Sequence, residues 1–144
     1  MTKGEIAENY FRQGYNCAQS VALAFCDEMN MSKDDVEKLT IGFGGGMGRL
    51  REVCGSVSGM TFVISAIYGE KGKKEVYELV QQAAKEFEKE NGSVVCRELL
   101  GLSIKGADSP IPEKRTKEYY KKRPCAELVH ISADILSDLL TKIN

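Results

Sequence analysis

The chain has 144 residues, a length that fits one domain able to bury a substantial hydrophobic core without disulfides. Its 20 basic and 21 acidic residues leave a net charge of −1, so no overall positive field favours binding to nucleic acid or to an anionic membrane. Residues 1–16 lack the apolar core of a signal peptide, and the longest apolar stretch, residues 60–68, is too short to span a bilayer. We therefore expect a cytoplasmic protein, residues 1–144 forming one domain, with no membrane insertion and no nucleic-acid partner.

Apolar residues recur at helical spacing through the first 109 residues, and all three prolines follow them. This pattern predicts an all-α fold. The first helix presents Ile6, Ala7, Tyr10 and Phe11 on one face and ends at Gly14. Asn16 is expected to cap a second helix with an apolar stripe from residue 18 to residue 29, and Ser32 to cap a third.

Residues 56–68 are apolar almost all round, which predicts a central helix buried on every side. Gly55 and Gly59 lie near its start, where a second helix can approach closely. The clearest amphipathic helix follows over residues 76–87 and ends at Asn91-Gly92. The remaining elements are a short helix capped by Ser93, an extended surface connection over residues 103–124, and a last helix from Pro124 to about Ile143.

The stretch GFGGGMGRLREVCGSVSGM, residues 42–60, holds seven glycines and one cysteine. It is no P-loop, because Gly48 precedes Arg-Leu rather than Lys and a hydroxyl residue, and the spacing does not fit the dinucleotide fingerprint. We interpret the glycines as a compact turn whose N–H groups point toward Cys54, as in an anion-binding nest. Positive φ is expected at Gly45, Gly46 or Gly48.

Five cysteines occur without any C-x-x-C pair, so a shared site has to be assembled by the fold. Cys17, Cys54, Cys96 and Cys125 are each expected at a helix N-terminus, where unpaired N–H groups and the helix dipole stabilise a thiolate. Cationic neighbours add to this effect: Arg49 and Arg51 near Cys54, Arg97 beside Cys96, and Lys122 and Arg123 beside Cys125. Cys26 is expected to stand apart as a small core residue.

Four segments carry a family resemblance: GYNCAQSV (14–21), FGGGMGRLREVCGSVSGM (43–60), CRELLG (96–101) and RPCAELV (123–129). Together they resemble the C_GCAxxG_C_C family of redox-active proteins along nearly the whole chain. The resemblance implies that Cys17, Cys54, Cys96 and Cys125 are the four signature cysteines. It further implies that Gly55 and Gly59 belong to the Cys-Gly-Ala-x-x-Gly element, and we expect this pair beside a bound cofactor. Ser56 stands where the family pattern has alanine, and its hydroxyl can bond a thiolate. Members are often encoded near transporter genes.

Two chemistries fit four gathered cysteines. Two thiols can cycle with a disulfide while the others tune or resolve it, or all four can hold an iron–sulfur cluster or zinc. Redox use is favoured, with an electron donor, electron acceptor or thiol protein as the partner. The alternative is a non-enzymatic metal-binding or regulatory protein associated with a transporter.

Three further expectations concern single residues and one charged run. Cys54 is expected to be the most reactive thiol, with a pKa below the ordinary value, provided that its sulfur faces the glycine turn. His130 shares a helix face with Asp134 and Asp138, which we interpret as a solvated polar face. The basic run over residues 114–123 is interpreted as a solvated helix or loop that also lowers the pKa of Cys125.

Overall fold

A computed structural model describes residues 1–143, and within them the chain forms nine α-helices and two single-turn 3-10 helices. The α-helices are α1 (Lys3–Arg12), α2 (Cys17–Leu23), α3 (Cys26–Met29), α4 (Lys33–Thr40), α5 (Gly55–Tyr68), α6 (Lys73–Asn91), α7 (Cys96–Leu99), α8 (Lys117–Lys122) and α9 (Cys125–Ile143). The 3-10 helices are η1 (Ile41–Phe43) and η2 (Gly69–Lys71). The all-α prediction is confirmed.

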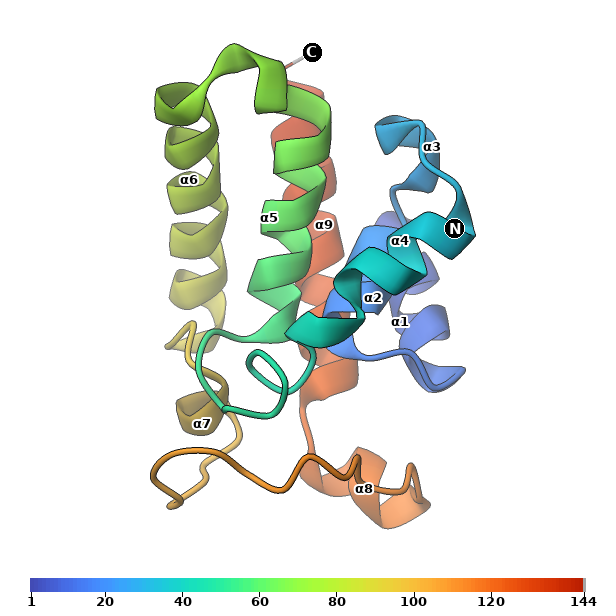
Figure 1. Ribbon diagram of the computed structural model, residues 1–144, viewed down its shortest axis with the longest axis vertical. Helices are drawn as coiled ribbons and strands as arrows, with labels where there is room; N and C mark the ends of the chain where they lie inside the picture. Colours follow the sequence, from blue (N-terminus) through green and yellow to red (C-terminus); the bar gives the residue numbers. More distant parts are fainter. Residues whose placement is uncertain (144) are drawn as a thin grey trace.

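Helix α5 occupies the centre and packs against α2, α6 and α9, while α1 packs along α9 (Figure 1). The N-termini of α5 and α9 lie at one end of the bundle, together with α7, the glycine turn and the segment that leads to α8 (Figure 1). Across residues 1–143, no helix combines the length and the apolarity that crossing a membrane requires. The functional residues predicted from the sequence therefore converge on one end of the bundle.

The predicted N-caps at the start of the chain are confirmed. The Asn16 side chain accepts a hydrogen bond from the N–H of Gln19, and Gln19 returns one to Asn16, forming a capping box. Ser32 caps α4 through the N–H of Asp35. The expected single stripe from residue 18 to residue 29 is wrong, because the helix is interrupted at Phe25. This residue leaves helical geometry and is fully buried in the core.

The central helix is confirmed at α5, but it is not buried on every side. Val63, Ile64 and Tyr68 are buried, whereas Ser65 and Ala66 are exposed. This exposed strip exists because α2, α6 and α9 cover three sides of α5 and leave the fourth open near its C-terminal end. The small side chains at these two positions expose little apolar surface to water.

The glycine turn adopts a left-handed path over residues 45–49. Gly45, Gly46 and Gly48 have φ of 66°, 71° and 54°, as predicted, and Met47 and Arg49 between them are also positive. The N–H groups of residues 47, 48, 49, 51 and 52 donate to carbonyls of residues 42–46. The turn is therefore a closed, self-bonded coil, and these five N–H groups are not available to a thiolate.

The segment expected as an extended connection, residues 103–124, is irregular only as far as Thr116. Thr116 caps α8 by accepting a hydrogen bond from the N–H of Tyr119, so a short helix interrupts the connection before α9. The short helix after α6 begins at Cys96 rather than at Ser93. The Ser93 hydroxyl instead accepts from the N–H of Val95.

Substitution of Gly46 by alanine should lower the free energy of unfolding by about 2 kcal/mol or more. A Cβ there would lie 2.6 Å from the backbone N of Glu52 and 2.7 Å from Cys96 Cβ, in addition to the left-handed strain. Gly48→Ala has the strain without the crowding and should cost about 1 kcal/mol. Gly42→Ala has neither and should stay within about 0.5 kcal/mol. Urea denaturation followed by circular dichroism measures all three, and equal losses would contradict the crowding at Gly46.

Candidate functional site

A pocket of about 360 Å³ lies at the end of the bundle where the cysteines were expected to meet. Cys17, Cys54, Cys96 and Cys125 all line it, together with the glycine turn and residues from the segment before α9. Its charged lining consists of Arg49, Arg51, Arg115, Arg123 and Glu113. The predicted grouping of four cysteines in one pocket is thus present.

Cys54 and Cys96 are placed by a two-residue antiparallel pairing between chain segments that are distant in sequence. Val53 pairs with Val95, the N–H of Cys54 donates to the carbonyl of Val94 at 2.8 Å, and the N–H of Cys96 donates to the carbonyl of Glu52 at 2.6 Å. Backbone hydrogen bonds on both sides fix the positions of the two Cα atoms. These cysteines therefore do not depend on side-chain packing alone for their positions.

Cys17 and Cys125 are the first residues of α2 and α9, and both line the pocket. Each side chain shifts the pKa of the other, with Cys17 acting as the proton donor. This interaction, followed by burial, raises the pKa of Cys17 well above its ordinary value. All five cysteines are free thiols in the structure. The pair therefore consists of one thiol that keeps its proton, Cys17, and one sulfur that favours the thiolate form, Cys125.

The surroundings of Cys125 lower its pKa to about 7 despite its burial. The hydrogen bond from Cys17 contributes most, the Tyr119 hydroxyl donates a second, and the charges of Arg123 and Arg115 add to the effect. The basic run does lower this pKa, as predicted, although it acts through α8 and its flanks rather than as a purely solvated segment. At neutral pH this thiol is about half ionised.

Cys54 was expected to be the most reactive thiol, with a pKa below the ordinary value. The predicted direction of this pKa shift is wrong. Burial raises the pKa of Cys54 to about 11, and the N–H and hydroxyl of Ser56 oppose this only in part. The side chain is 4% exposed and packs within the hydrophobic core. The glycine turn is not among the groups that lower this pKa, and the N–H groups of residues 47, 48, 49, 51 and 52 bond to carbonyls within the turn. A position at a helix N-terminus is therefore outweighed here by desolvation.

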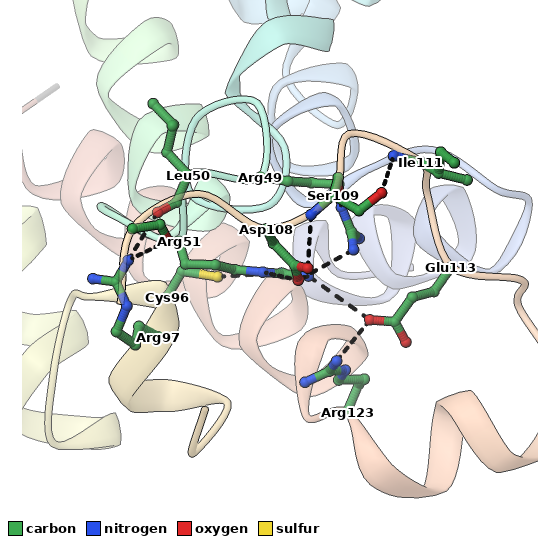
Figure 2. Close-up of polar contacts among 11 residues, drawn as sticks. Arg49, Leu50, Arg51, Cys96, Arg97, Asp108, Ser109, Ile111, Glu113 and Arg123 are labelled. Atoms are coloured by element: carbon green, nitrogen blue, oxygen red, sulfur yellow. Dashed lines mark hydrogen bonds and ion pairs between the residues drawn. The ribbon is translucent and has the colours of Figure 1, made fainter. Parts of the chain in front are cut away.

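Arg51 was expected beside Cys54 because the two residues are close in sequence. Its side chain contacts Cys96 instead. Its guanidinium donates to Cys96 Sγ at 3.6 Å and to Asp108 at 3.0 and 3.2 Å (Figure 2). The same group lies 3.7 Å from Glu113, which in turn pairs with Arg123 (Figure 2). Burial raises the pKa of Cys96, and the Arg51 contact opposes that rise.

The glycines of the sequence motif have packing roles at the site. Gly46 lies against Cys96, and a Cβ on Gly55 would lie 3.1 Å from Cys17 Cβ. A Cβ on Gly59 would lie 2.9 Å from the carbonyl of Ala18, so α2 approaches α5 closely there, as expected from the sequence. Gly55 also lines the pocket. Contact of Gly55 and Gly59 with a cofactor stays a prediction.

Cys26 begins α3 and does not share the lining of this pocket, so its predicted separation from the other cysteines is confirmed. It is half-buried rather than a core residue. His130 lies on a partly exposed polar face, as expected, since its side chain is 34% exposed, that of Asp134 is 44% exposed and Asp138 is exposed. Its ring lies 2.9 Å from Glu8 and 3.2 Å from Asp134, at the packed contact between α1 and α9.

The four cysteines do not form a ready ligand set for zinc or an iron–sulfur cluster. Among residues 1–143, no group of three or more histidine, cysteine, aspartate or glutamate side chains is arranged to hold a metal ion. A four-thiolate centre requires all its sulfurs at bonding distance from shared metal ions. The residues as placed do not fit such a centre, and we derive no step through one.

Sequence reasoning missed the partners that set the chemistry of the pocket. Tyr119, Asp108 and Glu113 all contact site residues, but they lie in a segment whose sequence shows no helical period until residue 117. The one available signal was the pair of tyrosines within a strongly basic run. Aromatic residues in such a run indicate a face that packs rather than one that is solvated.

At neutral pH, Cys125 should alkylate about a hundredfold faster than Cys54, because its larger thiolate fraction outweighs the lower nucleophilicity of a weakly basic thiolate. Its rate should rise tenfold per pH unit below pH 7 and level off above it.

Tyr119→Phe removes a donor to the thiolate and should raise the pKa of Cys125 by about one to two units. Tyr120→Phe is the matched control and should leave it unchanged. Mass spectrometry of alkylated peptides against pH checks this, and a faster Cys54 would refute it.

Comparison with known protein families gives a match over most of the chain. The family model described as "Putative redox-active protein (C_GCAxxG_C_C)" matches residues 15–139 of the 144. Searches of curated proteins and of solved structures returned no match. Since the match spans all four pocket cysteines and most of the chain, the protein belongs to the C_GCAxxG_C_C family.

Proposed function

We propose that the protein is a dithiol redox protein in which Cys125 and Cys17 cycle between two thiols and a disulfide. The observation that carries the proposal is that these two side chains line one pocket at the starts of two helices and shift each other's pKa in opposite directions. Membership of a family described as redox-active supports the same chemistry. No metal enters the reaction as proposed.

The reaction begins with the Cys125 thiolate, which attacks one sulfur of an external disulfide. An S–S bond forms to Cys125, the external S–S bond breaks, and one thiolate leaves. Cys17 then loses its proton, and its thiolate attacks Cys125 sulfur and releases the second external thiol. Two electrons pass from the protein to the external disulfide, and of the two released thiolates one takes the proton lost by Cys17 and the other takes a proton from water. The reverse sequence reduces the protein at the expense of a dithiol donor.

The asymmetry of the pair supports this assignment of roles. The attacking thiol in disulfide exchange performs best when its pKa is near the ambient pH, which fits the value of about 7 at Cys125. Cys17 keeps its proton at rest, because its pKa is raised by donation to Cys125 and by burial. The resolving thiol thus becomes nucleophilic only after the charge on Cys125 has been consumed.

Cys96 and Cys54 have separate roles in the same proposal. Cys96 lines the same pocket and contacts the buried guanidinium of Arg51, so we assign it as a second, slower thiol. Its thiolate would attack Cys125 sulfur of the first disulfide, break the bond to Cys17 and release the Cys17 thiol. Cys54 is 4% exposed with a pKa of about 11, so it stays protonated. We assign Cys54 to packing at the start of α5.

Mild oxidation of the reduced protein with one equivalent of diamide should produce a disulfide between Cys17 and Cys125. The count of free thiols should fall from the initial five by two, and peptide mapping should locate the bond. Cys17→Ser and Cys125→Ser should each abolish this product, whereas Cys26→Ser should leave it intact because Cys26 lies outside the pocket.

Two results would overturn the proposal. One is a first disulfide between Cys54 and Cys96, with Cys17 and Cys125 still reduced. The other is iron or zinc in stoichiometric amount after anaerobic purification, with protection of all four pocket cysteines from alkylation. Metal analysis of the freshly purified protein distinguishes the second result directly.

A further inference from the structure

The pocket carries more positive charge than its carboxylates neutralise. Four guanidinium groups line it, those of Arg49, Arg51, Arg115 and Arg123. Two carboxylates pair with them: Asp108 binds Arg49 and Arg51, and Glu113 binds Arg123 and lies near Arg51. Among residues 1–143, no carboxylate lies within ion-pair distance of Arg115. Four guanidinium groups against two carboxylates leave two positive charges, and the partly ionised Cys125 thiolate offsets these only in part.

Arg115 is held so that its charge stays at the pocket. Two of its nitrogens donate to the backbone carbonyls of Phe11 and Tyr15, at 2.7 and 3.0 Å. Its guanidinium lies over the Phe11 ring, 3.9 Å from the centroid, and over the Tyr119 ring at 5.1 Å. Neutral partners fix its position without cancelling its charge. The uncompensated charge therefore belongs to the resting pocket rather than to a mobile surface side chain.

The accessibility of the sulfurs restricts what can react with them. Cys54, Cys96 and Cys125 are 4%, 6% and 8% exposed, and Cys17 is half-buried. A disulfide on the surface of a folded protein cannot reach thiols at this depth without rearrangement. The pocket volume of about 360 Å³ falls in the range of sites for small molecules.

We propose that the pocket selects a small anionic substrate, namely a low-molecular-weight disulfide that carries carboxylates close to its sulfurs. This inference rests on the proposed dithiol function and adds the substrate class. The carboxylates would lie against the uncompensated guanidinium charge, while the S–S bond is presented to Cys125. Phe11, Leu99 and Leu128 also line the pocket and offer apolar surface for the carbon atoms between these groups.

The sharpest test compares iodoacetate with iodoacetamide as reagents for Cys125. Both react by the same step, in which an S–C bond forms and iodide leaves, and both require the thiolate. The ratio of their rate constants therefore cancels any change in the pKa of Cys125 and reports the charge of the pocket alone. The reference is the same ratio for a neutral free thiol, N-acetylcysteinamide, in the same buffer.

The ratio of iodoacetate to iodoacetamide should be at least about fivefold higher for Cys125 than for the free thiol, the factor that one charge contact supplies in water. Arg115→Gln should remove most of this excess, and Arg49→Gln should reduce it. Arg12→Gln is the matched control, because Arg12 lies on exposed α1 surface with Glu8 and does not share the pocket lining. It should leave the ratio unchanged.

Dithiodipropionate, hydroxyethyl disulfide and cystamine then test the substrate class with a dianion, a neutral molecule and a dication. Oxidation of the reduced protein should be fastest with the dianion and slowest with the dication. Arg115→Gln should reduce the differences between these three rates. Three results would overturn the anionic selectivity. They are a ratio for Cys125 equal to that of the free thiol, no reaction with either alkylating reagent, and a ratio that neither arginine substitution changes. Equal oxidation by all three disulfides, with a bond still formed between Cys17 and Cys125, would overturn the substrate class and leave the dithiol function standing.

Discussion

The buried guanidinium of Arg51 is the interaction on which the architecture of the site depends. A charge that is 5% exposed has to be compensated by anions and hydrogen bonds, and Arg51 obtains them from Asp108, Glu113 and Cys96. Asp108 and Glu113 belong to the irregular segment before α8, so this segment has to cross the end of the bundle. Arg51 and Arg49 hold this segment in place through Asp108, and the segment forms one wall of the pocket (Figure 2). The packed helices α2, α5 and α9 form the opposite wall.

The glycine turn serves the backbone rather than an anion. Its left-handed path brings residues 51–53 alongside residues 94–97, and five N–H groups between residues 47 and 52 bond to carbonyls of residues 42–46. Gly46 has to lack a side chain because Cys96 lies directly against it. The dense glycines thus explain how two cysteines far apart in sequence reach one pocket. Steric exclusion beside sulfur accounts for Gly46, whereas Gly45 and Gly48 are required by the left-handed backbone.

Helical period and capping residues were sufficient to predict the fold, because α5, α6 and α9 are long enough to show a clear pattern. The position of cysteines at helix starts was also readable, although Cys26 begins α3 as well, so this feature does not separate site from non-site residues. The order of thiol acidity was not readable. It depends on burial at Cys54 and on Tyr119 and Arg115 at Cys125, and these contacts arise from a segment without periodicity. Sequence distance to an arginine misled in the case of Arg51, whose side chain points away from Cys54 toward α7.

The pair formed by Cys17 and Cys125 at the starts of α2 and α9 links stability to redox state. A bond between them would enclose about three quarters of the chain, and in the chain-entropy treatment a loop of about 100 residues stabilises a folded protein by about 4.7 kcal/mol. By thermodynamic reciprocity, the fold would favour the oxidised pair by the same free energy, equivalent to about 100 mV for a two-electron couple. Loosening of the contact between α2 and α9 would then raise the reduction potential. Packing of the hydrophobic core would therefore set the reduction potential of the pair.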